Sequence, residues 1–287
     1  MSATLDLRGA QRMFWGGTEA QSLYYGGTLL WTKPAPPGGL RADTQAFIAR
    51  VAELGGTAIA GAQATSLNSF FTTAAASTWW PKINTLYSRF ADSIASRVDL
   101  KGQSKIAVQA GAGGNLPWSR EFGWSAGANN QGLDLNINPS AVSTQASASL
   151  ILWYARLPTG VQGEISDQIG TTGGVYARFI NDGAVRVRLH NGGNINFNTG
   201  HMATGFRAAS RTATNSLQIY GAAGQQIGSS TVASVAPVAT SLYLGPPGGG
   251  GLTSDAGVFA VGFGQGLTGA EILALRNAMS DLIVAFA

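Results

Sequence analysis

The chain has 287 residues, of which only 11% are charged, 40 are glycine and none is cysteine. Ordinary soluble proteins carry about 25% charged residues, so small polar residues or partner subunits must cover this surface, and assembly is favoured. The lack of cysteine excludes disulfides and cysteine-ligated metal sites. The net charge of +4 is thinly spread, without the Lys/Arg cluster that marks nucleic-acid binding.

The first residues lack a signal-peptide pattern, and no apolar run approaches the roughly 18 residues that span a bilayer. We therefore expect a protein made in the cytoplasm, without membrane insertion. If it acts outside a cell, it would leave by lysis or inside a particle.

Residues 1–33 contain an internal echo, in which FWGGT at 14–18 is followed by YYGGT at 24–28. Aromatic residues around Gly-Gly turns predict a small β-hairpin arm. An isolated hairpin is marginal in water, so we expect this arm to dock on another chain. The alternative is a strand pair that extends the chain's own main sheet.

A Pro/Gly linker at residues 34–40 separates this arm from a predicted helical segment at residues 41–104. Asp43 is the expected N-cap of a first helix that stops at Gly55-Gly56. Two more stripes with helical spacing predict a second and a third helix. Their apolar residues are Leu67, Phe70, Phe71 and Ala74, and then Ile83, Leu86, Tyr87 and Phe90. Trp79 and Trp80 are expected to start the third helix with their rings packed on the sandwich; a sugar-stacking platform is the alternative.

Strand patterns dominate residues 105–287. Leu133, Leu135 and Ile137 alternate with polar residues, and residues 150–154 form an apolar run. Residues 175–180 and 185–189 flank a turn signal and predict a hairpin. In its second strand Val185, Val187 and Leu189 would face the core, and Arg186, Arg188 and His190 the solvent. Further strands are predicted within residues 215–244 and at 258–263.

A helix from Thr268 should close this domain. Thr268 and Glu271 match a capping box, with Leu267 and Ile272 as a hydrophobic staple. An apolar stripe predicts that the helix lies on the sandwich or on a neighbouring subunit. The stripe consists of Ile272, Leu275, Met279, Leu282, Ile283 and Phe286. We predict a mainly β fold, an antiparallel jelly-roll (concanavalin A-like) sandwich with a preceding helical segment, an N-terminal hairpin arm and a C-terminal helix.

The motifs that would carry catalysis are weak. Residues 123–127 match G-x-S-x-G around Ser125, but no helix is predicted after the serine, as a nucleophile elbow requires. Glu164 and Asp167 are the nearest pair of carboxylates for glycoside hydrolysis. Three residues apart on a strand, they would point to opposite faces. We therefore predict no catalytic residue and no enzyme.

No metal or cofactor site is predicted either. His190 and His201, the only histidines, have no acidic cluster beside them. Structural calcium stays open, because its carbonyl and Asn/Asp ligands leave little sequence signature. The residues that could supply such oxygens are Asn181, Asp182, Asn191, Asn194, Asn196 and Asn198.

The chain resembles a family of bacteriophage and prophage structural proteins that carry a concanavalin A-like (LamG-type) sandwich and are related to those of gene transfer agents. Four stretches carry the resemblance, through their order along the chain. They are residues 25–31, 43–90, 132–156 (with Asn138-Pro139-Ser140) and 211–279 (with LYLG at 242–245 and GLT at 266–268). In such proteins the sandwich binds or packs, and the resemblance carries over no catalytic residue.

The resemblance implies a non-enzymatic virion protein, a tail fibre or tail-tip component that binds a host surface or its glycans. Residues 1–33 would dock on other virion proteins, and a homo-oligomer is expected, with a trimer typical of a fibre. The alternatives are a capsid spike or decoration protein, a free glycan-binding module and a glycan-cleaving enzyme.

Overall fold

The computed structural model gives the backbone of residues 14–15, 18–19, 22–25 and 28–32 in the N-terminal part. Beyond that it describes residues 39–110, 115–125, 131–157, 165–166, 175–179, 184–193, 195–198, 203–245 and 256–286. The chain divides into two compact units, Met1–Leu40 and Arg41–Ala287.

The first unit contains two short antiparallel pairs. Strand β1 (Phe14–Trp15) pairs with β2 (Thr18–Glu19), and β3 (Ser22–Tyr25) pairs with β4 (Thr28–Thr32). Trp15 lies opposite Thr18, and Tyr25 lies opposite Thr28. Each pair is therefore joined across one of the two Gly-Gly steps, and the sequence echo corresponds to two hairpins of the same register. The predicted N-terminal hairpin arm is confirmed.

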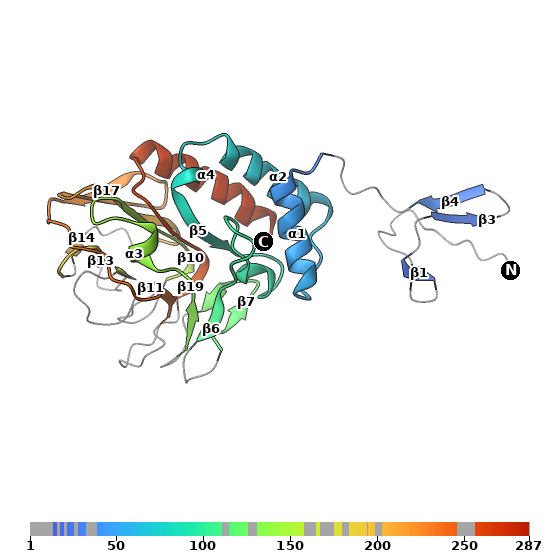
Figure 1. The fold of residues 1–287 in the computed structure, drawn as a ribbon, viewed down its shortest axis with the longest axis horizontal. Helices are drawn as coiled ribbons and strands as arrows, with labels where there is room; N and C mark the ends of the chain where they lie inside the picture. The colour runs from blue at the N-terminus through green and yellow to red at the C-terminus, as the bar shows by residue number, and fades with distance from the viewer. Residues whose placement is uncertain are drawn as a thin grey trace. The chain divides into compact units, whose positions relative to one another are not determined.

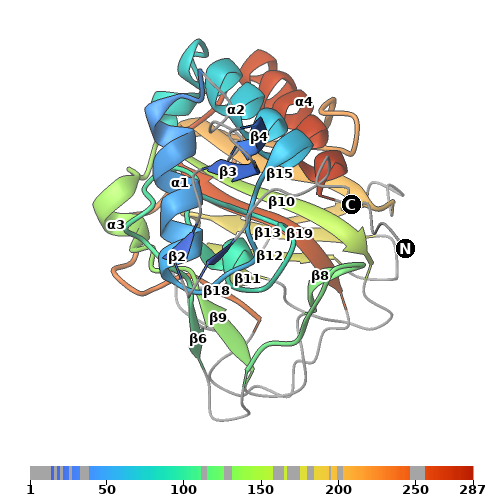
Figure 2. The ribbon, with the colours of Figure 1, turned by 90° about the vertical axis from the view of Figure 1, so that its right-hand side faces the viewer.

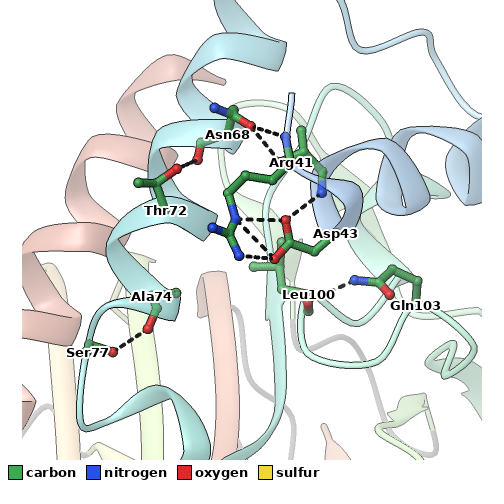
Figure 3. Close-up of polar contacts among 9 residues, drawn as sticks. Arg41, Asp43, Asn68, Thr72, Ala74, Ser77, Leu100 and Gln103 are labelled. Atoms are coloured by element: carbon green, nitrogen blue, oxygen red, sulfur yellow. Dashed lines mark hydrogen bonds and ion pairs between the residues drawn. The ribbon is translucent and has the colours of Figure 1, made fainter. Parts of the chain in front are cut away.

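The second unit begins with helices α1 (Ala42–Glu53) and α2 (Gly61–Ala75). The N-cap of α1 is Arg41, not Asp43, so the predicted cap was wrong by two positions. Asp43 lies in the first turn, where a carboxylate favours the helix dipole, and forms an ion pair with Arg41 (Figure 3). Asn68 of α2 accepts hydrogen bonds from the Arg41 amide and the Thr44 hydroxyl, which ties the two helices together. Gly55, at φ +78°, follows the end of α1 as predicted.

The predicted third helix is wrong. Residues Ile83–Ser88 form a strand, β5, preceded by the single 3₁₀ turn η1 (Trp80–Lys82). Tyr87 packs between the two sheets, and Leu86 is buried against Gly262. A strand that is buried on both faces has no polar alternation, so its apolar residues can mimic helical spacing.

The main body of the second unit is an antiparallel β-sandwich of two sheets, as predicted. One sheet has eight strands in the order β17-β16-β15-β10-β19-β8-β7, with β5 also paired to β19. Its other strands are β7 (Trp118–Ser119), β8 (Gly123–Ser125), β10 (Ala148–Arg156), β15 (Gly205–Ala213), β16 (Ser216–Tyr220), β17 (Gln226–Ser230) and β19 (Gly257–Gly264). The 3₁₀ turn η2 (Ala95–Arg97) and the short helix α3 (Pro139–Val142) lie in connections.

The second sheet has seven strands in the order β14-β13-β12-β11-β18-β9-β6. They are β6 (Val108–Ala110), β9 (Gly132–Asp134), β11 (Ile165–Ser166), β12 (Val175–Phe179), β13 (Ala184–Leu189), β14 (Ile195–Asn198) and β18 (Tyr243–Leu244). Between the sheets lies one apolar core, to which β10 contributes Leu150 and Leu152, and β13 contributes Val185 and Val187.

Helix α4 (Gly269–Ala285) covers the outer face of the eight-stranded sheet. Its capping box is present as predicted, because Thr268 and Glu271 each bond the other's backbone N–H. Burial alone would raise the pKa of Glu271, but hydrogen bonds, led by that from Lys82 at 2.7 Å, hold it below its usual value. Arg276 of α4 donates to the Ala222 carbonyl beyond β16. Helix α2 packs beside α4, and both lie on the far side of the unit from β6 (Figures 1 and 2).

Candidate ligand-binding face

The two sheets differ in what covers their outer faces. In β15 of the eight-stranded sheet, every residue from Phe206 to Arg211 is buried, because the second sheet lies on one side and α4 on the other. Ser210 illustrates the helix side: its hydroxyl donates to the Leu267 carbonyl and accepts from the Leu267 N–H. This sheet offers no outward surface between Phe206 and Arg211.

Along β13 of the seven-stranded sheet, buried and outward-facing side chains alternate as predicted up to Leu189. Val185, Val187 and Leu189 are buried in the core, while Arg186 and Arg188 are half-buried on the opposite side. On β14, Phe197 enters the core, and Asn196, which pairs with Arg186, is exposed. The outward surface of this sheet is therefore polar and faces away from α2 and α4.

The strand register aligns a row of residues on that surface. Val108 pairs with Asp134, which pairs with Tyr243, and directly paired residues share a face of a sheet. The same row continues through β11 and β12 to Arg188 on β13. We call the surface defined by the following described residues the open face. They are Val108, Asp134, Arg186, Arg188, Asn196 and Tyr243.

The open face combines groups that suit a polar ligand. Val108 is 56% exposed, although it is apolar, and Tyr243 beside Asp134 is half-buried. A tyrosine offers an apolar ring together with a hydroxyl that both donates and accepts hydrogen bonds. Asp134 keeps an acceptor oxygen for a ligand, because its Oδ1 atom accepts from the Asn136 N–H. This row could not be predicted from the sequence, since residues 108, 134 and 243 meet only through the sheet register.

The cavity between the sheets is a less suitable site. It has a volume of about 20 Å³ and an apolar lining that includes Leu150, Val187 and Ile219. The space is sufficient for roughly one water molecule. Arg207 reaches this lining, and its guanidinium donates to the carbonyls of Phe206 and Ala203. Burial lowers the pKa of Arg207, and these carbonyl bonds satisfy part of its hydrogen-bonding capacity.

Ser125 is not placed as a nucleophile. It is the last residue of β8, where it pairs with Gly257 of β19 in an antiparallel ladder. Its N–H donates to the Pro117 carbonyl. The strand-turn-helix bend of a nucleophile elbow is therefore absent from Gly123–Ser125. The rest of the motif, residues 126–127, lies outside the described residues, as do Glu164 and Asp167.

His190 does not face solvent, so this prediction was wrong. Strand β13 ends at Leu189, and His190 adopts a φ of +55°, which breaks the alternation and buries the ring completely. Its Nε2 atom lies 2.8 Å from the Ser143 hydroxyl, which in turn donates to the Pro139 carbonyl at 2.7 Å. The serine proton is thus directed to Pro139, so Nε2 donates to Ser143. This buried pair links β13 to α3 and is a structural contact.

Two of the proposed oxygen ligands for a metal, Asn191 and Asn196, have described side chains. Asn191 is fully buried, and its side chain bonds the backbone of Leu189 and Gly193. Asn196 lies on the open face, and Asn198 ends β14. Asn181, Asp182, Asn194 and His201 lie outside the described residues. The described part of the chain holds no group of three or more His, Asp or Glu side chains that could ligate a metal ion.

The tryptophan pair does not form a sugar platform. Trp79 is 1% exposed, and Trp80 is half-buried. Both rings contact Phe70 of α2, with centroid separations of 6.2 and 5.8 Å. Lys101 lies over the Trp80 ring at 4.4 Å and donates to the Trp80 carbonyl. The rings therefore pack on α2.

One buried carboxylate was not predicted from the sequence. Asp99 is fully buried, and its Oδ1 atom accepts from the N–H groups of Leu86 and Lys101. Burial raises the pKa of Asp99 to about 6, against the lowering effect of these bonds and of Lys105. Burial, with the nearby charge of Asp99, also raises the pKa of Tyr87, whose hydroxyl donates to the Leu135 carbonyl. This cluster anchors β5 and adjoins the open face through Leu135, since the charge of the neighbouring Asp134 also raises the pKa of Tyr87.

Comparison with known proteins defines the fold but no family. No protein-family model and no curated protein matches the chain. Among solved structures, Trypanosoma rangeli sialidase in complex with 2,3-difluoro-KDN is similar, with a TM-score of 0.51 and 14% identity over 75% of this chain. A mutant of the same sialidase displaying trans-sialidase activity gives a TM-score of 0.50 and 13% identity over 77% of this chain. The binding domain of botulinum neurotoxin serotype D gives 0.50 and 11% over 68%.

The likeness covers only part of those proteins. It spans 38% of each sialidase chain and 51% of the toxin domain. At these identities it shows the fold alone, and it confirms the lectin-like antiparallel sandwich. In the described part of the chain, no helix is long and apolar enough to cross a membrane.

Proposed function

We propose that this chain is a non-enzymatic binding protein whose sandwich recognises a glycan through the open face. The observation that carries the proposal is the row Val108–Asp134–Tyr243, an exposed apolar side chain, a carboxylate and a tyrosine on the outward surface of the seven-stranded sheet. A sugar offers apolar C–H faces to a ring and hydroxyls to a carboxylate, so this combination suits a saccharide. The solved structures with a similar fold include sialidases, which act on glycans, and this supports the proposal.

We also propose that the protein acts in a bacteriophage virion, as an appendage that is part of a tail fibre or tail tip and is docked through residues 1–33. The separate N-terminal unit supports this, because each of its two described hairpins has two strands, fewer than independent stability requires. The low content of charged residues also favours assembly with other subunits.

A glycan array tests the binding function. The full chain should bind a subset of bacterial surface glycans, and Tyr243→Ala should lose most of that signal while the fold is retained. Leu273→Ala is the control, because Leu273 is also partly exposed, at 45%, but lies on α4. No binding by the wild-type chain at high concentration, or equal loss in both variants, would contradict the proposed site.

Two further measurements test the remaining parts. Location of the chain in purified particles would support the virion setting, and its absence from particles would contradict it. Deletion of residues 1–33 should abolish incorporation and leave the sandwich folded. Release of reducing sugar from a bound glycan, lost in Glu164→Gln or Asp167→Asn, would show that the protein is an enzyme.

A further inference from the structure

The arginines of β13 form an unusual group on the open face. Arg186 and Arg188 lie two residues apart on one strand and are both half-buried on its outward side. The register partner of Arg186 on β12 is Arg178, and its partner on β14 is Asn196. Arg186 and Arg188 therefore place two positive charges on the outward side of β13.

Arg186 in particular has no internal partner. Within the described part of the chain its guanidinium makes no hydrogen bond or ion pair, and its Nε atom is shielded from solvent. Each buried donor left without an acceptor costs about 1–3 kcal/mol, so such a donor in a native fold calls for an explanation. An acceptor supplied from outside would satisfy this donor and neutralise the local charge.

The described carboxylate of the open face is too far away to act as that acceptor. Asp134 lies in the same row as Arg188, but β18, β11 and β12 separate β9 from β13. With neighbouring strands about 4.8 Å apart, the four steps amount to roughly 19 Å. That distance is about twice the Debye length at physiological ionic strength. The arginine end and the Asp134–Tyr243 end of the open face are thus two separate subsites.

We propose that the arginine end binds the carboxylate of an acidic saccharide, with Arg186 as the principal contact. This inference rests on the proposed glycan-binding function and names the substrate class. A planar guanidinium matches a carboxylate through two parallel N–H···O bonds. The Asn196 amide next to Arg186 can donate to and accept from sugar hydroxyls. A saccharide long enough to reach Tyr243 would occupy both subsites.

Titration of the full-length protein with three polysaccharides tests this. The probes are polygalacturonate, which carries carboxylates, dextran sulfate, which carries sulfates, and neutral dextran. Polygalacturonate should bind, and Arg186→Gln should weaken that binding about tenfold or more, as expected for the loss of a charge-assisted bond. Arg186→Lys keeps the charge without the planar fork and should recover only part of the affinity.

The matched control is Arg50→Gln, which removes the same charge from α1, where Arg50 pairs with Glu53 at 2.7 Å. It should leave polygalacturonate binding unchanged. The melting temperature separates binding from structure: without ligand, Arg186→Gln should be as stable as wild type or more so, because a buried donor without an acceptor is removed. A clear loss of stability would assign Arg186 a structural role and overturn the inference.

The outcomes also separate this inference from the proposed function. If polygalacturonate binding survives Arg186→Gln but not Tyr243→Ala, the open face binds glycans and the arginine subsite is wrong. Polyglutamate, titrated as a fourth probe, carries carboxylates without sugar rings. An affinity equal to that for polygalacturonate would show that the site accepts any carboxylate and would overturn the saccharide assignment. A preference for dextran sulfate would overturn the carboxylate assignment. If no glycan of any charge binds, the proposed function itself fails.

Discussion

The two sheets of the sandwich share one core, but their polar residues differ in whether they have hydrogen-bond partners within the fold. On the covered sheet, Ser210 is buried and bonded to the α4 entry, and the fully buried Arg211 donates to the carbonyls of Leu189, Thr214 and Val232. On the open sheet, Arg186 is left without an internal partner. The difference indicates that Ser210 and Arg211 serve the fold, whereas Arg186 is available to a ligand.

The largest effect should come from the covered side. Phe90, which is fully buried, contacts Phe47 and Phe286 at centroid distances of 4.8 and 4.6 Å. Phe90→Ala should lower the free energy of unfolding by about 3–5 kcal/mol, because the cavity cannot fill. Tyr243→Ala on the open face should change it far less. Denaturant unfolding of both variants measures the contrast, and equal losses would contradict it.

A pH-dependent effect should arise at Asp99. Because burial raises its folded-state pKa from 3.8 to about 6, the folded protein holds this proton more tightly than the unfolded chain. The contribution of Asp99 to the free energy of unfolding is therefore present at low pH and is lost as pH rises from about 4 to about 6. The loss amounts to roughly 3 kcal/mol at most. Asp99→Asn keeps an acceptor for Leu86 and Lys101 and cannot ionise.

Asp99→Asn should therefore gain stability relative to wild type as pH rises through that window. Unfolding curves at several pH values would measure the difference in free energy of unfolding between the two proteins. The effects of the other titrating groups cancel in this difference, because both proteins share them. Parallel profiles for the two would show that Asp99 does not titrate there.

A smaller effect is expected at the α4 cap. Thr268→Ala removes the acceptor for the Glu271 N–H and should cost about 1 kcal/mol of stability. Thr72→Ala is the control, since that exposed hydroxyl bonds the Asn68 carbonyl within α2 (Figure 3). Its removal should be neutral or slightly stabilising. If thermal melts rank the two variants in the reverse order, the cap does not hold α4 on the covered sheet.

The smallest stability effect belongs to the open face. Arg186→Gln should stay within about 0.5 kcal/mol of wild type, as is usual for surface positions, with any change in the stabilising direction. Calorimetry without ligand is the measurement. A loss of more than 1 kcal/mol would place Arg186 among the residues that serve the fold, like Arg211.

The sequence predicted those parts of the fold that depend on local pattern. The α4 capping box, the α2 stripe and the alternation of Val185, Val187 and Leu189 were all correct, because each lies within one element. The sequence failed where tertiary burial overrides periodicity. Strand β5 mimicked a helix since both of its faces are buried, and His190 turned inward because β13 ends one residue earlier. Most of the open face could not be predicted, because strand register brings Val108, Asp134 and Tyr243 together.

The central claim, that the open face binds a glycan and the helix side does not, can be tested with two single cysteines. The chain contains none, so Val108→Cys and Val284→Cys each give one labelling position, and both valines are exposed, at 56% and 70%. Each variant would carry the same environment-sensitive fluorophore and be titrated with a glycan that binds the wild type. We predict that the label at residue 108 weakens binding or changes its emission, while the label at residue 284 reports nothing. A response at 284 alone, or none at 108 despite binding, would contradict the account.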